Sequence, residues 1–331
     1  MNPADSSITR AARARGCFLG GAIGDALGAP VEFWSLDRIL SECGPDGVTT
    51  MLSGYGRDGG AITDDTQMTL FAVEGLVTAD GTDSLAESVH EAFLRWYRAQ
   101  TQPFSKFVGS TDGLLAEEWL WSMRAPGNTC LTALAGGQVG TAAVNDSKGC
   151  GTVMRSAPFG FTSSPIELAA ESSFHTHGHP TAAVSAAYLA HVVALLLDNH
   201  DVQYAVTTTR SIIVDRFPDT HHETTTAVDK AIALANDGPP NPLTVESLGG
   251  GWIAEEALAI AILVALTATD WHETLTRAVT HSGDTDSTGA ITGNILGALW
   301  GDSDLPTNWL NQLEGQPTIT RLAESLAAAK L

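Results

Sequence analysis

The apolar residues of this chain recur with helical spacing over most of its length, and this pattern most constrains the fold. Two stretches, residues 182–190 and 254–268, are apolar around most of a helical circumference, which is typical of helices enclosed by other helices. The alternation expected of strands is nearly absent, and an α/β sheet would need alternating strands and helices. We therefore expect an all-α fold, a single large multi-helix globular domain covering residues 1–331.

Helical patterns with i, i+3, i+4 spacing divide the chain into segments. The first has apolar residues from Phe18 to Leu27, with Gly20, Gly24 and Gly28 at intervening positions where another helix can approach closely. A dinucleotide-binding fold is the alternative for these glycines, but no apolar strand precedes them. Further helices are expected after residue 66 and at residues 85–98, 114–123, 165–173, 181–198, 204–217, 224–236, 253–268, 272–279, 288–300 and 318–330.

Composition excludes several classes of protein. Seventeen basic against 38 acidic residues give a net charge of −21, which argues against a nucleic-acid partner, because phosphate binding needs Lys and Arg clusters. The four cysteines form no CxxC pair, so we expect a reducing compartment and no zinc site. No apolar leader begins the chain, and the run at 182–197 is interrupted by Tyr188 and His191. We expect a cytoplasmic monomer without a membrane segment.

Two short acidic stretches precede helical patterns far apart in the chain. They are Thr63-Asp64-Asp65-Thr66 and Gly283-Asp284-Thr285-Asp286-Ser287. Asp, Ser and Thr are common N-caps, and negative charge stabilises a helix start, so capping alone explains either stretch. Together they offer more carboxylates than two caps require, and oxygen ligands suit Mg²⁺ or Ca²⁺. We expect an N-cap at Asp286 or Ser287, and both stretches closing on the same ions.

Two loops carry further candidates for binding. Glycines at 149 and 151 allow backbone N–H groups to approach a phosphate or sugar, although an ordinary turn is the favoured explanation of the glycines taken alone. The second loop, His175-Thr176-His177-Gly178-His179-Pro180, has three alternating histidines. A transition metal is one interpretation, but the accompanying carboxylates and hydroxyls suit hard ions better. We expect these rings to bind a substrate or cap a helix.

Taken together, these motifs resemble the ADP-ribosylglycohydrolase family, which includes the dinitrogenase reductase-activating glycohydrolases. The resemblance runs in order from about residue 16 to residue 301. It rests on six motifs: Gly20 to Gly28 with Glu32, Thr63-Asp64-Asp65-Thr66, Gly149-Cys150-Gly151 through Met154-Arg155, Thr176-His177-Gly178-His179-Pro180, Gly250-Gly251-Trp252 with Glu255-Glu256-Ala257-Leu258-Ala259, and Gly283-Asp284-Thr285-Asp286-Ser287.

The resemblance implies two Mg²⁺ or Mn²⁺ ions and hydrolysis of a glycosidic bond at the ribose C1″ of ADP-ribose. By motif, the metal ligands would be Thr63, Asp64, Asp65, Asp284, Asp286 and Ser287. At the position of Ser287 the family commonly has Thr, and the Thr side chain is stiffer at χ1. Substrate contacts would come from Gly149, Cys150, Gly151, Met154, Arg155 and His177. Glu32 matches a family carboxylate beside the metals, and either Glu32 or Asp65 would be the catalytic acid or base.

Physical chemistry agrees with this implied reaction. Two cations can hold the vicinal ribose hydroxyls and lower the pKa of water for attack on C1″, and carboxylates stabilise an oxocarbenium-like transition state. We expect a metal-dependent hydrolase that acts on an ADP-ribosylated protein or small molecule, with the ADP-ribose N-linked to arginine. The alternatives are an O-linked serine or O-acetyl substrate, or an inactive relative that binds ADP-ribose.

Overall fold

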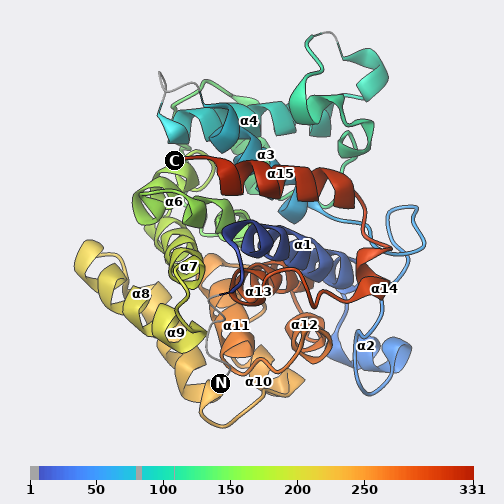
Figure 1. The fold of residues 1–331 in the computed structure, drawn as a ribbon, viewed down its shortest axis with the longest axis vertical. Helices are drawn as coiled ribbons and strands as arrows, with labels where there is room; N and C mark the ends of the chain where they lie inside the picture. Colours follow the sequence, from blue (N-terminus) through green and yellow to red (C-terminus); the bar gives the residue numbers. More distant parts are fainter. Residues whose placement is uncertain (1–6, 80–83, 108) are drawn as a thin grey trace.

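The fold is built from helices throughout the part of the chain that the structure describes, residues 7–79, 84–107 and 109–331 of a computed structural model (Figure 1). Extended pairing there is limited to two isolated bridges, Gly54 with Arg57 and Gly149 with Ile253. The all-α prediction is confirmed. The α-helices are α1 (Arg10–Gly28), α2 (Leu36–Cys43), α3 (Asp64–Thr78), α4 (Leu85–Thr101), α5 (Asn128–Ala135), α6 (Pro165–Ser173), α7 (Pro180–Leu197), α8 (Val202–Arg216), α9 (His222–Ala235), α10 (Pro242–Glu246), α11 (Ala254–Leu266), α12 (Trp271–Val279), α13 (Thr285–Trp300), α14 (Thr307–Leu310) and α15 (Gln316–Ala328).

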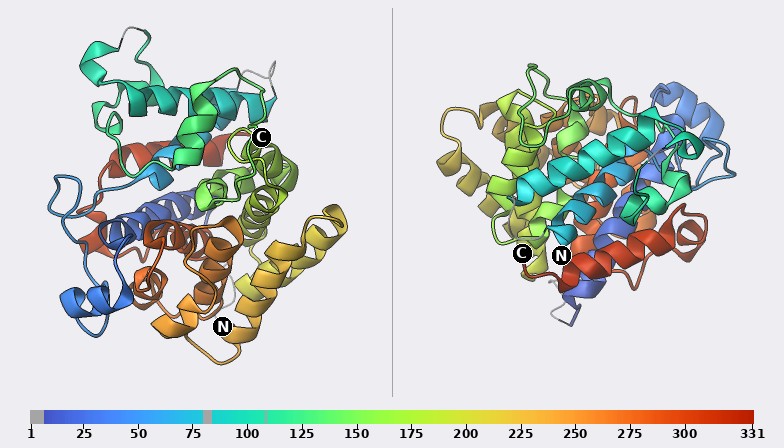
Figure 2. Two further views of the ribbon diagram at one scale, coloured as in Figure 1. Left: turned by 180° about the vertical axis from the view of Figure 1, so that it is seen from behind. Right: turned by 90° about the horizontal axis from the view of Figure 1, so that it is seen from above.

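Helices α1 and α13 lie side by side in the centre of the molecule (Figures 1 and 2). Their contact is made by backbone against backbone, because glycines face each other along the seam. A Cβ added at Gly24 would lie 2.0 Å from the Gly289 carbonyl oxygen, and one added at Gly293 would lie 2.0 Å from that of Gly20. Only glycine permits this approach. The predicted role of the α1 glycines in close helix packing is confirmed.

The antiparallel direction of this pair determines where its ends meet. At the end of α1, the Thr285 hydroxyl donates to the Gly28 carbonyl at 2.9 Å, and a Cβ at Gly28 would lie 2.2 Å from the Thr285 oxygen. The last turn of α1 and the segment after it therefore lie beside the first turn of α13. Glu32 comes from the first of these segments and Asp284 and Asp286 from the second, although about 250 residues separate them in sequence.

Helices α7 and α11 pack in the interior, as their apolar character predicts. Helix α7 contacts α6, α8 and α11, and α11 also contacts α9 and α13. Helix α7 starts at Pro180 and by length and composition alone could cross a membrane, although its apolar run is interrupted by Tyr188 and His191. However, 78% of the helix is buried inside the protein, which is the environment of a core helix.

One predicted helix is wrong, and four short ones, α2, α5, α10 and α14, were not predicted. Residues 114–123 form two 3₁₀ turns, Gly113–Ala116 and Glu118–Leu120, because side chains bind the backbone groups that an α-helix needs. The Glu74 carboxylate accepts from the Leu114 N–H at 2.6 Å, and the Trp121 indole donates to the Leu115 carbonyl at 3.1 Å. Helices α2, α5, α10 and α14 are too short for their periodicity to stand out.

Candidate metal centre

Asp25 joins the last turn of α1 to the first turn of α3. Its buried carboxylate accepts hydrogen bonds from the backbone N–H and the hydroxyl of both Thr63 and Thr66, at 2.5 to 3.1 Å. These bonds satisfy donors at the start of α3 that have no partner within the helix. Burial raises the pKa of Asp25 to about 6, which the four hydrogen bonds partly offset. Asp25 therefore fixes the acidic start of α3 against α1.

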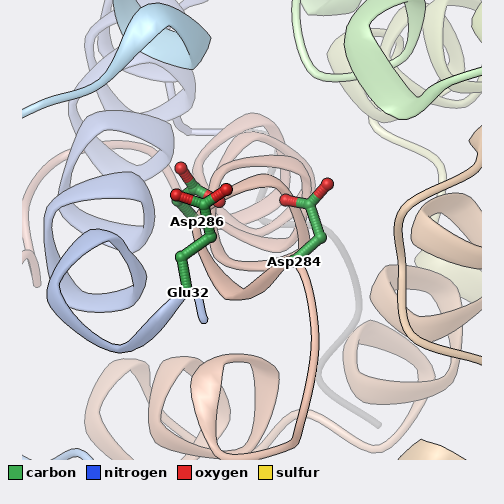
Figure 3. Close-up of side chains that lie close together, drawn as sticks. All are labelled: Glu32, Asp284 and Asp286. Atoms are coloured by element: carbon green, nitrogen blue, oxygen red, sulfur yellow. The ribbon is translucent and has the colours of Figure 1, made fainter. Parts of the chain in front are cut away.

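Glu32, Asp284 and Asp286 form a compact carboxylate group (Figure 3). Each offers an oxygen, and these oxygens lie within 4.8 Å of one another, with all three side chains buried. The N-cap of α13 is Asp284, whose Oδ1 accepts from the Ser287 N–H at 3.3 Å. The expected N-cap at Asp286 or Ser287 is wrong, because the helix begins at Thr285. Asp286 is consequently free to point toward Glu32 instead of capping.

The start of α3 adds Asp64 and Asp65 to this group. Burial raises the pKa of Asp65 well above its usual value, with further contributions from Asp64, Asp25 and Asp284. The pKa of Asp286 is raised by burial and next by Asp65. Helices α3 and α13, which begin with the two acidic stretches, contact each other, and α1 contacts both of them. The structure therefore brings the two acidic stretches together.

The carboxylates lack cationic partners among the described side chains, and two of their oxygens have no partner at all. Glu32 Oε2 and Asp65 Oδ1 are buried without a hydrogen-bond partner, and among the described residues none of the carboxylates in this centre takes part in an ion pair. Burial, Asp284 and Asp25 raise the pKa of Glu32 to about 8. Uncompensated negative charge on oxygen ligands fits a hard divalent cation.

Two hydroxyls complete the predicted ligand set. The Thr63 hydroxyl donates to Asp25 Oδ1 at 2.9 Å and accepts from the Asp65 N–H at 3.3 Å. The Ser287 hydroxyl lies 3.6 Å from the sulfur of Cys150. Both hydroxyls are buried within the carboxylate centre. Coordination of a metal by Thr63, Asp64, Asp65, Asp284, Asp286 or Ser287 stays a prediction.

The glycine loop lies next to the carboxylates. Cys150 begins a 3₁₀ turn, and its thiol donates to Asp284 Oδ2 at 2.8 Å. A Cβ added at Gly149 or at Gly151 would lie 3.2 Å from the ring of His177. The bridge between Gly149 and Ile253 ties the loop to the start of α11. The structure thus brings the predicted loop and His177 together beside the predicted metal ligands.

Arg155 supports this loop from the interior. Its buried guanidinium donates to the Thr176 hydroxyl at 2.5 Å and lies 4.4 Å from the centroid of the Phe93 ring. The Thr176 hydroxyl in turn lies 2.8 Å from His177 Nδ1, and burial together with Arg155 lowers the pKa of His177 to about 3. Arg155 therefore faces the protein interior, which favours positioning a neutral His177 over direct substrate contact. Met154 is likewise buried, with its sulfur 3.9 Å from the Ser287 hydroxyl.

Sequence reasoning assigned no role to two residues of this region. Asp25 lies within the motif from Gly20 to Gly28 but was given no role, although a charged side chain in an otherwise apolar, glycine-rich helix is itself a signal of a buried polar contact. Tyr55 lies in a turn between Gly54 and Arg57. Burial, Glu32 and Asp286 raise the pKa of its hydroxyl, so it lies near the carboxylates. Its sequence surroundings carry no periodic signal that would locate it.

The fold and the site define an all-α protein with a buried carboxylate centre between helix ends. The chain belongs to the ADP-ribosylglycohydrolase family, whose family model matches residues 6–331. It is 26% identical over 331 residues to the ADP-ribosylarginine hydrolase Tri1 of Serratia proteamaculans, covering 95% of this chain and 78% of that protein. It is also 26% identical over 310 residues to the ADP-ribosyl-[dinitrogen reductase] glycohydrolase of Rhodospirillum rubrum, covering 91% and 90%.

A solved structure supports the same assignment. The chain aligns with an ADP-ribosylglycohydrolase-related protein with a TM-score of 0.74 and 26% identity, covering 97% of this chain and 99% of the other. The membership predicted from the six motifs is confirmed. The protein is a glycosidase of the ADP-ribosylglycohydrolase type, in agreement with the named activities of its relatives.

Proposed function

We propose that this protein is a divalent-metal-dependent hydrolase that releases ADP-ribose from arginine side chains by cleaving the N-glycosidic bond at C1″. The observation that carries the proposal is the buried carboxylate centre, in which Glu32 Oε2 and Asp65 Oδ1 have no partner. The arginine linkage is favoured because the relative Tri1 is named an ADP-ribosylarginine hydrolase. Mg²⁺ or Mn²⁺ fits an all-oxygen ligand set better than a softer ion does.

The residues of the chain divide into ligands, loop and proton-transfer groups. Asp64, Asp284 and Asp286, with the hydroxyls of Thr63 and Ser287, would hold the cations. When bound, such cations orient vicinal hydroxyls and make water more acidic. The backbone N–H of Gly151 would bind a phosphate, since glycine lets the backbone approach an anion closely, whereas the Cys150 N–H donates to the Trp252 carbonyl.

Glu32 fits the role of proton-transfer group best. Cleavage breaks the bond between C1″ and the guanidinium nitrogen, forms a bond between C1″ and a water oxygen, and moves one proton from that water through the enzyme to the nitrogen that leaves, so that arginine is released as its guanidinium. The pKa of Glu32, raised to about 8 by its surroundings, lies near neutral pH, where a group exchanges protons efficiently. Asp65, which follows Asp64 in the first turn of α3 and keeps a buried oxygen without a partner, would serve mainly as a ligand.

A direct assay tests this function. The protein is incubated with ADP-ribosylarginine and, separately, with an ADP-ribosylserine peptide, each with Mg²⁺, Mn²⁺ or excess chelator, and released ADP-ribose is measured. We expect release from the arginine substrate with either metal and its loss with chelator. Preferential release from the serine peptide would reassign the linkage. Binding of ADP-ribose without release from either substrate would show an inactive relative.

A further inference from the structure

Two exposed aromatic rings stack on each other beside the carboxylate centre. The rings of Phe33 and Trp252 have centroids 5.5 Å apart and an interplanar angle of 21°. Phe33 is 75% exposed and Trp252 is 43% exposed, so most of the outer surface of the pair faces solvent. Large exposed aromatic side chains cost hydration free energy and are enriched where another molecule binds. The pair therefore needs an explanation beyond packing.

Both rings are fixed to the centre by their neighbours in sequence. Phe33 directly follows Glu32. The loop that carries Trp252 is held by two backbone hydrogen bonds. The Gly250 carbonyl accepts from the Asp284 N–H at 2.8 Å, and the Trp252 carbonyl accepts from the Cys150 N–H at 3.1 Å. The pair thus connects the segment after α1 with the loop before α11. A group attached to a sugar held at the carboxylates would leave past these rings.

A third exposed aromatic residue lies near the segment that carries Phe33, since a Cβ added at Gly54, directly before Tyr55, would lie 3.6 Å from the Pro30 side chain. Tyr55 is 41% exposed and adopts φ = +49°, an uncommon conformation for a residue with a side chain. Strain of this kind persists where the surrounding structure holds it, often at a functional site. Burial raises the pKa of its hydroxyl, with smaller contributions from Glu32 and Asp286. Phe33, Tyr55 and Trp252 together form what we call the aromatic rim.

The chemistry of the aromatic rim selects one class of ligand. Negative charge from the carboxylates and the electron-rich faces of the rings both attract cations, and a planar guanidinium also stacks on a ring. Arg124 already shows this behaviour within the protein, with its guanidinium 5.2 Å from the centroid of the Tyr55 ring. A hydroxyl leaving group, as on serine, would gain nothing comparable from the face of Phe33.

We propose that the Phe33–Trp252 pair is the acceptor subsite, which binds the guanidinium of the arginine as it leaves and so gives the enzyme its preference for this linkage. The inference rests on the proposed function, because it assigns the leaving-group side of the same reaction. The guanidinium would lie on the solvent-facing surface of the pair, since the two rings are too close together to admit a group between them.

The test compares Phe33→Ala, Phe33→Leu and Phe33→Tyr. Each variant is assayed on ADP-ribosylarginine, and the binding of agmatine, a free guanidinium probe, is measured by calorimetry with ADP-ribose present. We expect Phe33→Ala to raise KM for ADP-ribosylarginine and to weaken agmatine binding by about 5- to 30-fold, the range of a partly desolvated cation–π contact. Phe33→Leu keeps apolar area without a ring and should behave like Phe33→Ala, whereas Phe33→Tyr should retain the wild-type values.

Two controls isolate the subsite. Affinity for ADP-ribose alone should be unchanged in every variant, since the rings do not contact that part of the substrate. Tyr204, an exposed ring stacked on His200 with centroids 4.2 Å apart, provides a matched variant in α8, and Tyr204→Ala should behave as wild type. Unchanged agmatine affinity in Phe33→Ala, or wild-type affinity in Phe33→Leu, would overturn the inference. A loss of ADP-ribose affinity in Phe33→Ala equal to its loss of agmatine affinity would also overturn the inference.

Failure of the proposed function gives a different result from failure of this inference. If wild-type protein with metal releases no ADP-ribose from the arginine substrate, the proposed function fails and the subsite fails with it. If wild-type protein cleaves the arginine substrate and Phe33→Ala cleaves it with unchanged KM, only the subsite is wrong.

Discussion

At the scale of single residues, the centre combines carboxylates in different environments. Asp25 is satisfied by four hydrogen bonds, whereas Glu32 retains a buried oxygen without a partner. Because an unpartnered buried carboxylate is costly, Glu32 is suited to bind or exchange something, while Asp25 is suited to hold structure. Asp286 lies between these cases, since it points into the centre from a helix that Asp284 caps.

Replacing Asp286 and Glu32 separately distinguishes a ligand from a proton-transfer group. Asp286→Asn removes a negative charge at constant shape, so we expect weaker Mn²⁺ binding and loss of hydrolysis together. Glu32→Gln should leave Mn²⁺ and ADP-ribose binding nearly intact and lower kcat by about 10²–10⁴-fold, the usual contribution of general acid–base catalysis. Calorimetry and steady-state kinetics measure the two effects.

The matched control for these variants is Glu74→Gln. Glu74 is also a buried carboxylate, but it pairs with Arg95 away from the centre, so its variant should retain Mn²⁺ affinity. If Glu32→Gln binds Mn²⁺ as poorly as Asp286→Asn does, Glu32 is a metal ligand. If Glu32→Gln keeps the wild-type kcat, Glu32 has no catalytic role.

At the scale of elements, the α1–α13 pair shows what the sequence could and could not predict. The glycine spacing of α1 predicts a close helix neighbour, and α13 repeats glycine at the same four-residue spacing, at 289, 293, 297 and 301, a signal for the partner helix that our prediction did not use. The long periodic helices were predictable for the same reason that they are stable, since their apolar faces pack in the core. The absence of an α-helix at residues 114–123 was not predictable, because it depends on side chains distant in sequence, such as Glu74, that bind backbone groups there.

Gly24→Ala tests the contact between these two helices. Its Cβ would lie 2.0 Å from the Gly289 carbonyl oxygen, and a backbone oxygen cannot move aside as a flexible side chain can. We expect a loss of about 1–3 kcal/mol in the free energy of unfolding, as for other overpacked sites. Urea denaturation measures it. Mn²⁺ affinity should fall as well, because separating the helices moves Glu32 away from Asp284.

Gly136→Ala is the control for this substitution. Nothing lies within 4 Å of a Cβ at Gly136, and its φ of −87° suits any residue, so its unfolding midpoint should match that of the wild type. An unchanged midpoint in Gly24→Ala as well would contradict the rigid glycine seam.

At the scale of the whole molecule, the carboxylate centre joins parts of the chain that are distant in sequence. Its residues come from the segment after α1 and the first turns of α3 and α13, and the loop at 149–151 borders it. The family and the positions of the motifs were predictable because each motif is local. The pairing of Phe33 with Trp252 and the approach of Tyr55 were not, because exposed rings follow no periodic pattern and their contacts form only after the helices have packed.

This arrangement predicts that divalent metal stabilises the entire fold. In the absence of a cation the buried carboxylates repel one another across α1, α3 and α13, so a ligand that binds only the folded state should raise Tm. At 100 times its Kd, Mn²⁺ contributes about 2.7 kcal/mol, which corresponds to roughly 5 °C for a chain of this size. Thermal unfolding followed by circular dichroism in Mn²⁺ and in chelator measures the shift.

Two comparisons separate specific binding from screening of the net charge of −21. NaCl at matched ionic strength should reproduce little of the shift, because screening acts weakly on buried charges. Asp286→Asn should lose most of the shift, because it lacks a ligand while keeping nearly the same net charge. An equal rise in Tm for wild type and Asp286→Asn would mean that Mn²⁺ acts on the acidic surface, and the carboxylate centre would then not be the site that links metal to stability.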